Sequence, residues 1–257
     1  RGEDHLTNTP RQLLILKALG LTPPRYGHTN LIVGPDNTPL SKRHGSKSIK
    51  DLREQGYLPL ALVNYMARLG HTYTDHNDLM SFADCAKFFS LDHLVKAPAK
   101  YDEKQLHYWQ KEAVMQLSEE QLIEWASDVD MSIVPEAKRA EFLKLVRPNS
   151  LFCSEIAAWS EDLFSVDVSN DEDSLKVLST AGKGFFEVAI DALASVDDYK
   201  GLCSALKEKC GVKGKSLFMP LRLALTRQAR GPELEGVFEI LGKEIMAEKF
   251  LKIKEVL

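Results

Sequence analysis

The sequence predicts a mainly α-helical protein, with a small α/β segment at its beginning and two helical bundles after it. Only one short buried strand is expected, at residues 31–33, where three aliphatic residues precede a turn-rich stretch. From residue 48 onward the apolar residues follow a helical period almost throughout. Breaks at 148–150 and 165–173, rich in turn-forming or acidic residues, divide this helical part.

The first forty residues predict a helix, then the strand, then a loop. The helix begins at Thr9-Pro10, because proline is favoured in a first helical turn, and it ends at Gly20. Later helices are bounded by Gly, Pro, Asn, Asp or Ser, and no further strand pattern is present. We expect these helices at 58–69, 102–116, 118–128, 135–146, 150–159, 172–180, 184–194, 197–209, 216–227, 232–241 and 243–256.

Composition limits the class of protein. The 257 residues are 44% hydrophobic and 27% charged, and contain no apolar run long enough to cross a bilayer, so we expect a soluble protein of two or three compact units. The chain opens without Met or an export leader, which suggests a piece of a longer cytoplasmic protein. Its four cysteines lack paired spacing, which favours reduced core thiols. A zinc site at His71, His76 and Cys85 is the weaker alternative.

Charge is distributed unevenly along the chain. Residues 1–50 carry eight Lys/Arg against three Asp/Glu, and residues 200–230 carry eight against one, although the net charge is −4. Solvated helix faces would explain each run separately. An extended polyanion as partner would explain both.

The string PLSKRHG, at 39–45, is the most informative loop. Lys42 can supply a mobile positive charge to a polyphosphate, and Ser41 with exposed backbone N–H groups can add hydrogen bonds. An ordinary solvated loop is the alternative. The string is not a P-loop, because the glycine spacing and the terminal Lys-Ser/Thr are missing.

Several strings in order carry a family resemblance: RGEDHL and NTPRQ at the start, then LSKRHG, GYLPLALVNYMARLG, LFMPLRLALT and GPELEGVFEILGKE. Together they resemble glutamyl-tRNA synthetases of the bacterial type, which are class I aminoacyl-tRNA synthetases, over essentially the whole chain. The resemblance implies the end of a Rossmann-like catalytic domain at 1–36 and a signature loop with a helical stem-contact domain at 37–112. It also implies an all-helical anticodon-binding domain in two bundles, 113–168 and 169–257. The glutaminyl-type relatives fit less well, since their anticodon domains are β-barrels.

The resemblance also implies an ATP site. LSKRHG is similar to the second class I signature, KMSKS, which makes Lys42 the catalytic lysine of amino-acid adenylation. The motif residues would be Pro39, Leu40, Ser41, Lys42 and Arg43, with Pro39 replacing the first lysine, so one positive charge is missing. ATP, carrying Mg²⁺, would meet Leu31, Ile32, Asp4, Ser41, Lys42 and Arg43, while Arg1 and His5 would bind glutamate; no other metal is expected. The first class I signature, HIGH, is absent from these residues, so we expect a C-terminal part that does not activate glutamate alone.

The same resemblance assigns tRNA contacts. Lys47 and Lys50 would meet stem phosphates, Arg147 and Asn149 the first anticodon base, and Arg222, Pro232 and Leu234 the other two. Because Asn149 is shorter than the arginine of many relatives, preference for tRNA-Glu over tRNA-Gln stays open. We expect Trp109, Trp125 and Trp159 to be core residues rather than base-stacking platforms.

The implied whole protein is a monomeric cytoplasmic glutamate–tRNA ligase. The alternative is a noncatalytic helical adaptor, or a module that only binds tRNA.

Overall fold

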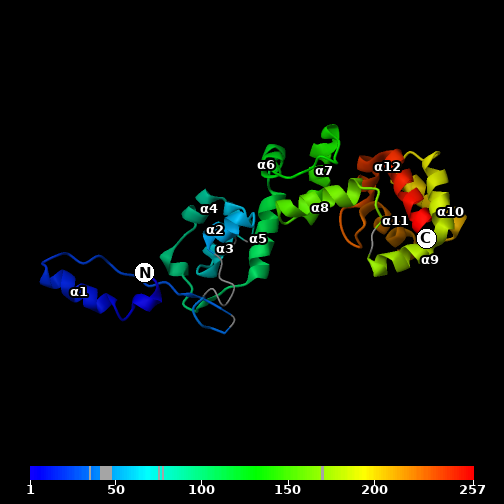
Figure 1. Cartoon of the computed structure of the whole chain (residues 1–257). Coiled ribbons are helices and arrows are strands. Elements are labelled where there is room, and N and C mark those ends of the chain that lie inside the picture. The colour runs from blue at the N-terminus through cyan, green and yellow to red at the C-terminus, as the bar shows by residue number, and fades with distance from the viewer. Residues whose placement is uncertain (35, 41–47, 75, 77, 169–170) are drawn as a thin grey trace. The chain divides into compact units, whose positions relative to one another are not determined.

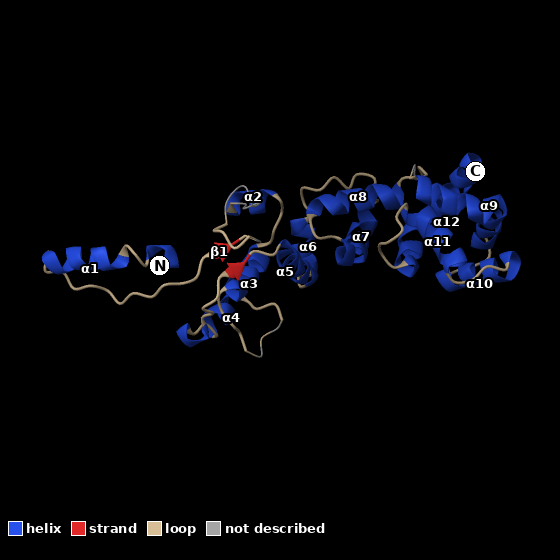
Figure 2. Cartoon of the chain, turned by 90° about the horizontal axis from the view of Figure 1, so that it is seen from below, coloured by secondary structure: helices blue, strands red, loops and turns tan. Residues whose placement is uncertain are grey.

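The computed structural model describes residues 1–34, 36–40, 48–74, 76, 78–168 and 171–257 (Figure 1). These residues form two compact units, Arg1–Gln116 and Leu117–Leu257, which are called unit 1 and unit 2 below. The predicted mainly helical fold is confirmed, and Figure 2 shows the few strand residues in red among blue helices. Within the described residues, every helix is too short or too polar to cross a bilayer.

Unit 1 combines short helices with a pair of two-residue strands. Its elements are η1 (Glu3–His5), α1 (Thr9–Ala18), β1 (Ile32–Val33), α2 (Ile49–Glu54), α3 (Pro59–Leu69), α4 (Phe82–Lys87), η3 (Leu91–His93), β2 (Ala99–Lys100) and α5 (Glu103–Met115). Helices α3 and α5 pack together, and the buried Gln110 side chain on α5 accepts a hydrogen bond from the Leu58 N–H at 2.8 Å, which caps the start of α3.

The expectation of a single strand was wrong, because β2 pairs in parallel with β1. Ile32 lies opposite Ala99 and Val33 opposite Lys100. The Ala99 N–H donates to the Leu31 carbonyl at 3.3 Å, and the Tyr101 N–H donates to the Val33 carbonyl at 3.0 Å. Each residue of β2 pairs with a residue of β1 that lies 67 positions away in the sequence. Because this pairing determines its conformation, such a short strand leaves no local pattern in the sequence.

Arg68 and Trp109 stabilise the segment that follows α3. The Arg68 guanidinium stacks 4.0 Å from the Trp109 ring centroid and donates to the carbonyls of His76 and Asp78 at 3.0 and 2.7 Å. Trp109 is 7% exposed and is therefore a core residue, as expected. His71 is used structurally, since its Nε2 lies 3.0 Å from both the backbone nitrogen and the carbonyl oxygen of Ser90.

The regular secondary structure of unit 2 is all helical within its described residues. Its elements are α6 (Glu119–Trp125), η4 (Glu136–Lys138), α7 (Arg139–Val146), η5 (Arg147–Asn149), α8 (Cys153–Phe164), α9 (Glu172–Leu193), α10 (Tyr199–Cys210), α11 (Lys215–Thr226) and α12 (Leu234–Val256). Helices α9 and α12 contain kinks at Gly182 and Gly242, where φ is 76° and 77°. These kinks fall where the sequence predicted breaks between separate helices.

One hydrophobic core joins all the longer helices of unit 2. Phe142 on α7, Ile156 on α8, Phe186 on α9, Leu217 on α11 and Phe250 on α12 are each fully buried. The core therefore runs across the break that the sequence placed at 165–173.

A lysine is also buried in this core. Lys249 on α12 is 2% exposed, and its Nζ donates to the carbonyls of Asp162 and Ser165 at 3.2 and 2.5 Å. These carbonyls belong to the last turn of α8, where a helix leaves backbone acceptors free and favours a cation. Lys249 thus ties the end of α8 to α12.

Candidate nucleic-acid interface

The beginning of the basic loop at 39–45 is fastened to strand β1. The Leu40 N–H donates to the Ile32 carbonyl at 3.0 Å, and Pro39 forms a bridge with Val33. Of the predicted motif residues, Pro39 and Leu40 are described, whereas Ser41, Lys42 and Arg43 lie outside the described residues, as does Lys47. Leu31 and Ile32 therefore lie directly beside the start of the predicted ATP loop.

The first residues of the chain pair with the segment just before strand β1. The Thr29 N–H donates to the Arg1 carbonyl at 2.7 Å, and the Glu3 N–H donates to the Thr29 carbonyl at 2.9 Å. The Asp4 carboxylate folds back over Gly2, where a Cβ would overlap it and would lie 3.3 Å from the Leu31 side chain. The structure thus brings Asp4 and Leu31, two predicted ATP contacts, close together.

The predicted glutamate-binding side chains have partners of their own. The Arg1 guanidinium contacts the Gln12 side-chain oxygen and lies 5.1 Å from the Tyr26 ring centroid. The His5 Nε2 lies 3.7 Å from the Asp4 carboxylate. Gln12 and Tyr26 were not predicted as site residues, and only their nearness to Arg1 in space reveals them.

Lys50 is well placed for a phosphate. Its side chain is 81% exposed on α2, and it forms a long ion pair of 3.8 Å with Glu54 one turn further on. Such exposed pairs are weak, so this lysine can exchange its partner for a phosphate at little cost.

In unit 2, Arg222 on α11 is bound to a turn before α12. Its guanidinium donates to the Pro232 carbonyl at 2.9 Å, although the two residues lie on different elements. Tyr199 at the start of α10 is close by. Burial raises the pKa of Tyr199, and the nearby positive charge of Arg222 acts in the opposite direction.

Trp159 contacts both Asn149 and the same turn. The Trp159 Nε1–H on α8 donates to the Asn149 carbonyl at 3.3 Å, and the far edge of the indole ring packs on Gly231, next to Pro232. The structure thereby brings together Asn149, Arg222 and Pro232, which are separated by as many as 83 positions in sequence. Trp159 is only partly buried against the core, so the expectation of a plain core residue missed its position between two predicted RNA-reading segments.

The other predicted contacts in unit 2 are less available. Arg147 donates to the Leu117 carbonyl at 3.1 Å, so its guanidinium serves in part to hold the beginning of unit 2. Pro232 and Leu234 are buried, and Leu234 belongs to the core. The side chains of these two residues are therefore not available to a ligand, and the Pro232 carbonyl already accepts a hydrogen bond from Arg222.

Unit 2 also carries exposed positive charge on α10, on α11 and next to them. Lysines and arginines with exposed side chains follow α10 and the segments on either side of α11, at Lys207, Lys209, Lys213, Lys215 and Arg230. On α11, Lys215, Met219 and Arg222 are spaced so that they share one face of the helix. The second basic zone of the sequence is therefore accessible to a polyanion.

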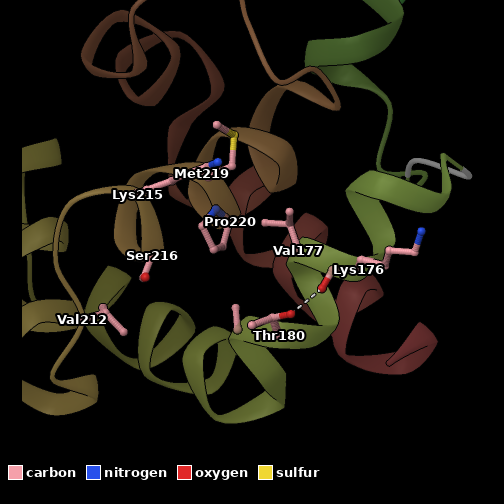
Figure 3. Close-up of a pocket in the computed structure, with 9 residues that line it drawn as sticks. Lys176, Val177, Thr180, Val212, Lys215, Ser216, Met219 and Pro220 are labelled. Atoms are coloured by element: carbon pink, nitrogen blue, oxygen red, sulfur yellow. Dashed lines mark hydrogen bonds between the residues drawn. The ribbon is translucent and has the colours of Figure 1, made fainter.

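A cavity of about 420 Å³ adjoins the start of α11, between this helix and α9 (Figure 3). Val177, Ala181, Val212, Met219 and Pro220 give it mainly apolar walls. The Lys176 amine is turned away from it, toward Glu172 and Asp173 at 3.7 and 3.4 Å. Within the part of the chain that is described, three or more His, Cys, Asp or Glu side chains nowhere gather in a way that could hold a metal ion.

Two protein families match the chain. The family described as "tRNA synthetases class I (E and Q), catalytic domain" matches residues 1–108, and the family described as "Anticodon binding domain" matches residues 118–251. The match boundary falls close to the division between unit 1 and unit 2.

Individual relatives agree with these matches. Glutamate–tRNA ligase 2 of Coxiella burnetii is 47% identical over 97% of this chain and 54% of the relative, and glutamate–tRNA ligase 1 of Methylococcus capsulatus is 47% identical over 95% and 52%. A solved glutamate tRNA ligase from Elizabethkingia meningosepticum, in complex with its amino acid, superposes with a TM-score of 0.84 at 25% identity. The matched region covers all of this chain and 56% of the Elizabethkingia protein. The chain spans about half the length of the curated relatives it matches.

Proposed function

Because the chain belongs to the glutamyl-tRNA synthetase family of the class I synthetases, we propose that it forms the tRNA-reading part of a glutamate–tRNA ligase. The observation that supports this most strongly is the meeting of Asn149, Arg222 and Pro232 at one basic surface of unit 2. Unstacked bases of an RNA loop are read by arginine side chains, amide groups and backbone groups of turns, and this surface offers all three. Phosphate contacts from the surrounding lysines supply affinity but not specificity.

The whole enzyme joins glutamate to tRNA-Glu in the cytoplasm in two steps. The glutamate carboxylate attacks the α-phosphate of ATP, which gives glutamyl-adenylate and releases pyrophosphate, and the tRNA then displaces AMP. Mg²⁺ arrives with ATP and shields its phosphate charge. Lys42 stabilises the charge that develops during the first step, and Pro39 leaves Lys42 and Arg43 as the cations of the motif.

Arg222→Ala tests the anticodon assignment. We expect the full 257-residue chain to bind tRNA-Glu with a steep dependence on salt, because lysines neutralise several phosphates. Arg222→Ala is expected to reduce discrimination between the native anticodon and single-base variants by about 1 to 3 kcal/mol. Gel-shift titration against each variant measures this.

Arg230→Ala is the matched control, since Arg230 is exposed near the same turn. It is expected to weaken all tRNAs alike and to lower the salt dependence slightly. Equal affinity of the unchanged chain for every anticodon variant would contradict the assignment.

Lys42→Ala separates a ligase from a noncatalytic adaptor. In the full-length enzyme we expect ATP–pyrophosphate exchange to slow by about tenfold or more, because a cation at the transition state is lost. The 257-residue chain alone is expected to give no exchange, since it contains no HIGH-type motif. Unchanged exchange in full-length Lys42→Ala would favour the adaptor.

A further inference from the structure

One face of α8 supports the loop 227–233 that connects α11 to α12. Trp159 and Asp162 lie one turn apart on this face. Asp162 pairs with Arg227 at 3.7 Å and accepts a hydrogen bond from the Gln228 side chain at 2.8 Å. The beginning of the loop is thus fixed to α8.

Trp159 fixes the end of the same loop. A Cβ built on Gly231 would overlap the Trp159 Cη2 atom and lie 3.0 Å from Cζ3, so only glycine allows the ring this close. Gly231 also has a φ of 152°, which side chains rarely adopt. The position of the backbone just before Pro232 is therefore set by the indole ring.

The opposite end of the indole ring contacts the other predicted reading segment. Its Nε1–H donates to the carbonyl of Asn149, the last residue of η5. A tryptophan side chain has only two rotatable bonds and a flat, stiff ring, so it works well as a fixed spacer. One side chain on α8 consequently touches both η5 and the turn Gly231–Leu234.

We infer that Trp159 is a positioning residue, whose indole sets the separation between Asn149 and the turn Gly231–Leu234 so that both face one RNA loop. This inference rests on the proposed function. Hydrogen bonds to base edges tolerate only a few tenths of an ångström, so two segments that read neighbouring bases need a fixed separation.

Packing alone does not account for Trp159. The fully buried positions of α8, Ile156 and Leu163, already anchor this helix in the core, whereas Trp159 remains partly exposed. A phenylalanine at 159 would supply apolar contact as well. What only tryptophan supplies is the combination of an N–H toward Asn149 and a ring long enough to reach Gly231.

The test measures affinity of the 257-residue chain for tRNA-Glu transcripts with the native anticodon and with changes at its first or its third base. Trp159→Phe is expected to lower discrimination at both positions together, by about tenfold, while affinity for an unrelated tRNA stays the same. Trp125→Phe is the matched control, because Trp125 also packs partly buried against the core of unit 2. It is expected to leave both discrimination ratios within about twofold.

A second pair of variants protects the test against a simple folding defect. Gly231→Ala is expected to lower discrimination, because the new methyl group collides with the indole. Adding Trp159→Phe, which removes the colliding ring atoms, is expected to restore part of that loss, by at least about threefold relative to additive behaviour. Mere destabilisation by two independent substitutions would instead make the two losses additive.

Three results would overturn the inference. Trp159→Phe could retain both discrimination ratios, or it could lose discrimination at one base only, as expected of a residue that stacks on that base. The effects of Gly231→Ala and Trp159→Phe could also be additive. If the unchanged chain itself fails to distinguish anticodons, the proposed function fails instead, which is a separate result.

Discussion

Replacing Phe186 with alanine is expected to lower the free energy of unfolding of unit 2 by about 3 to 5 kcal/mol. Phe186 on α9 is 0% exposed, and its ring centroid lies 6.0 Å from that of Phe250 on α12 and 5.2 Å from that of Phe185. Its removal leaves a cavity between the two longest helices, which are kinked and packed on one another and so cannot easily collapse into the space.

Urea unfolding followed by far-ultraviolet circular dichroism measures the change. Phe218→Ala is the matched control, because Phe218 is 42% exposed on α11 of the same unit, and it is expected to cost less than about 1 kcal/mol. Equal losses from the two substitutions would show that the core does not run between α9 and α12 as described.

Lys249 should give unit 2 an unusual dependence of stability on pH. Burial, together with the nearby positive charge of Arg227, lowers the pKa of Lys249 to about 8. The unfolded chain keeps its proton up to a pKa near 10.5, so between about pH 8 and 10.5 the unfolded state binds more protons than the folded state. Stability from this group therefore rises with pH across that window, by about 2 to 3 kcal/mol at pH 10.

Lys249→Met is expected to remove this rise. The comparison is a difference between two urea unfolding series, at neutral pH and near pH 10, so that the ionisation of tyrosines and cysteines cancels. Lys209→Met, at an exposed position on α10, should leave the rise in place. Parallel pH curves for the unchanged chain and Lys249→Met would contradict the prediction.

Most of the helices were predicted from local signals, because a 3.6-residue period of apolar residues and the capping residues can be recognised within one short stretch of sequence. Two short helices, α2 and α4, lie in the region expected to be helical from residue 48 onward but received no bounds of their own, although each begins with a capping box, Ser48 with Asp51 and Ser81 with Asp84. Too few turns follow these caps for a period to emerge. The second strand was missed for a different reason, since its conformation depends on pairing with β1 rather than on its own residues.

The candidate site was predictable as a set of residues but not as an arrangement. Family resemblance named Asn149, Arg222 and Pro232, yet no spacing in the sequence indicates that Trp159 stands between two of them. A partly exposed tryptophan and a glycine that precedes a proline are common features, and only the contact between them is informative. Burial of the Pro232 side chain likewise follows from tertiary packing, which no local pattern in the sequence indicates.

The hydrogen bonds from Lys249 to the end of α8 determine where this protein can be divided. A cut between the two bundles, near residue 168, would separate an ammonium group from the only two carbonyls it is seen to bind in the described chain. The same cut would take Asp162 from Arg227 and Trp159 from Gly231. Gene fusions and domain exchanges should therefore keep residues 117–257 together. The second bundle of a homologue should replace the one in this chain only if the α8 helix of that homologue is transferred as well.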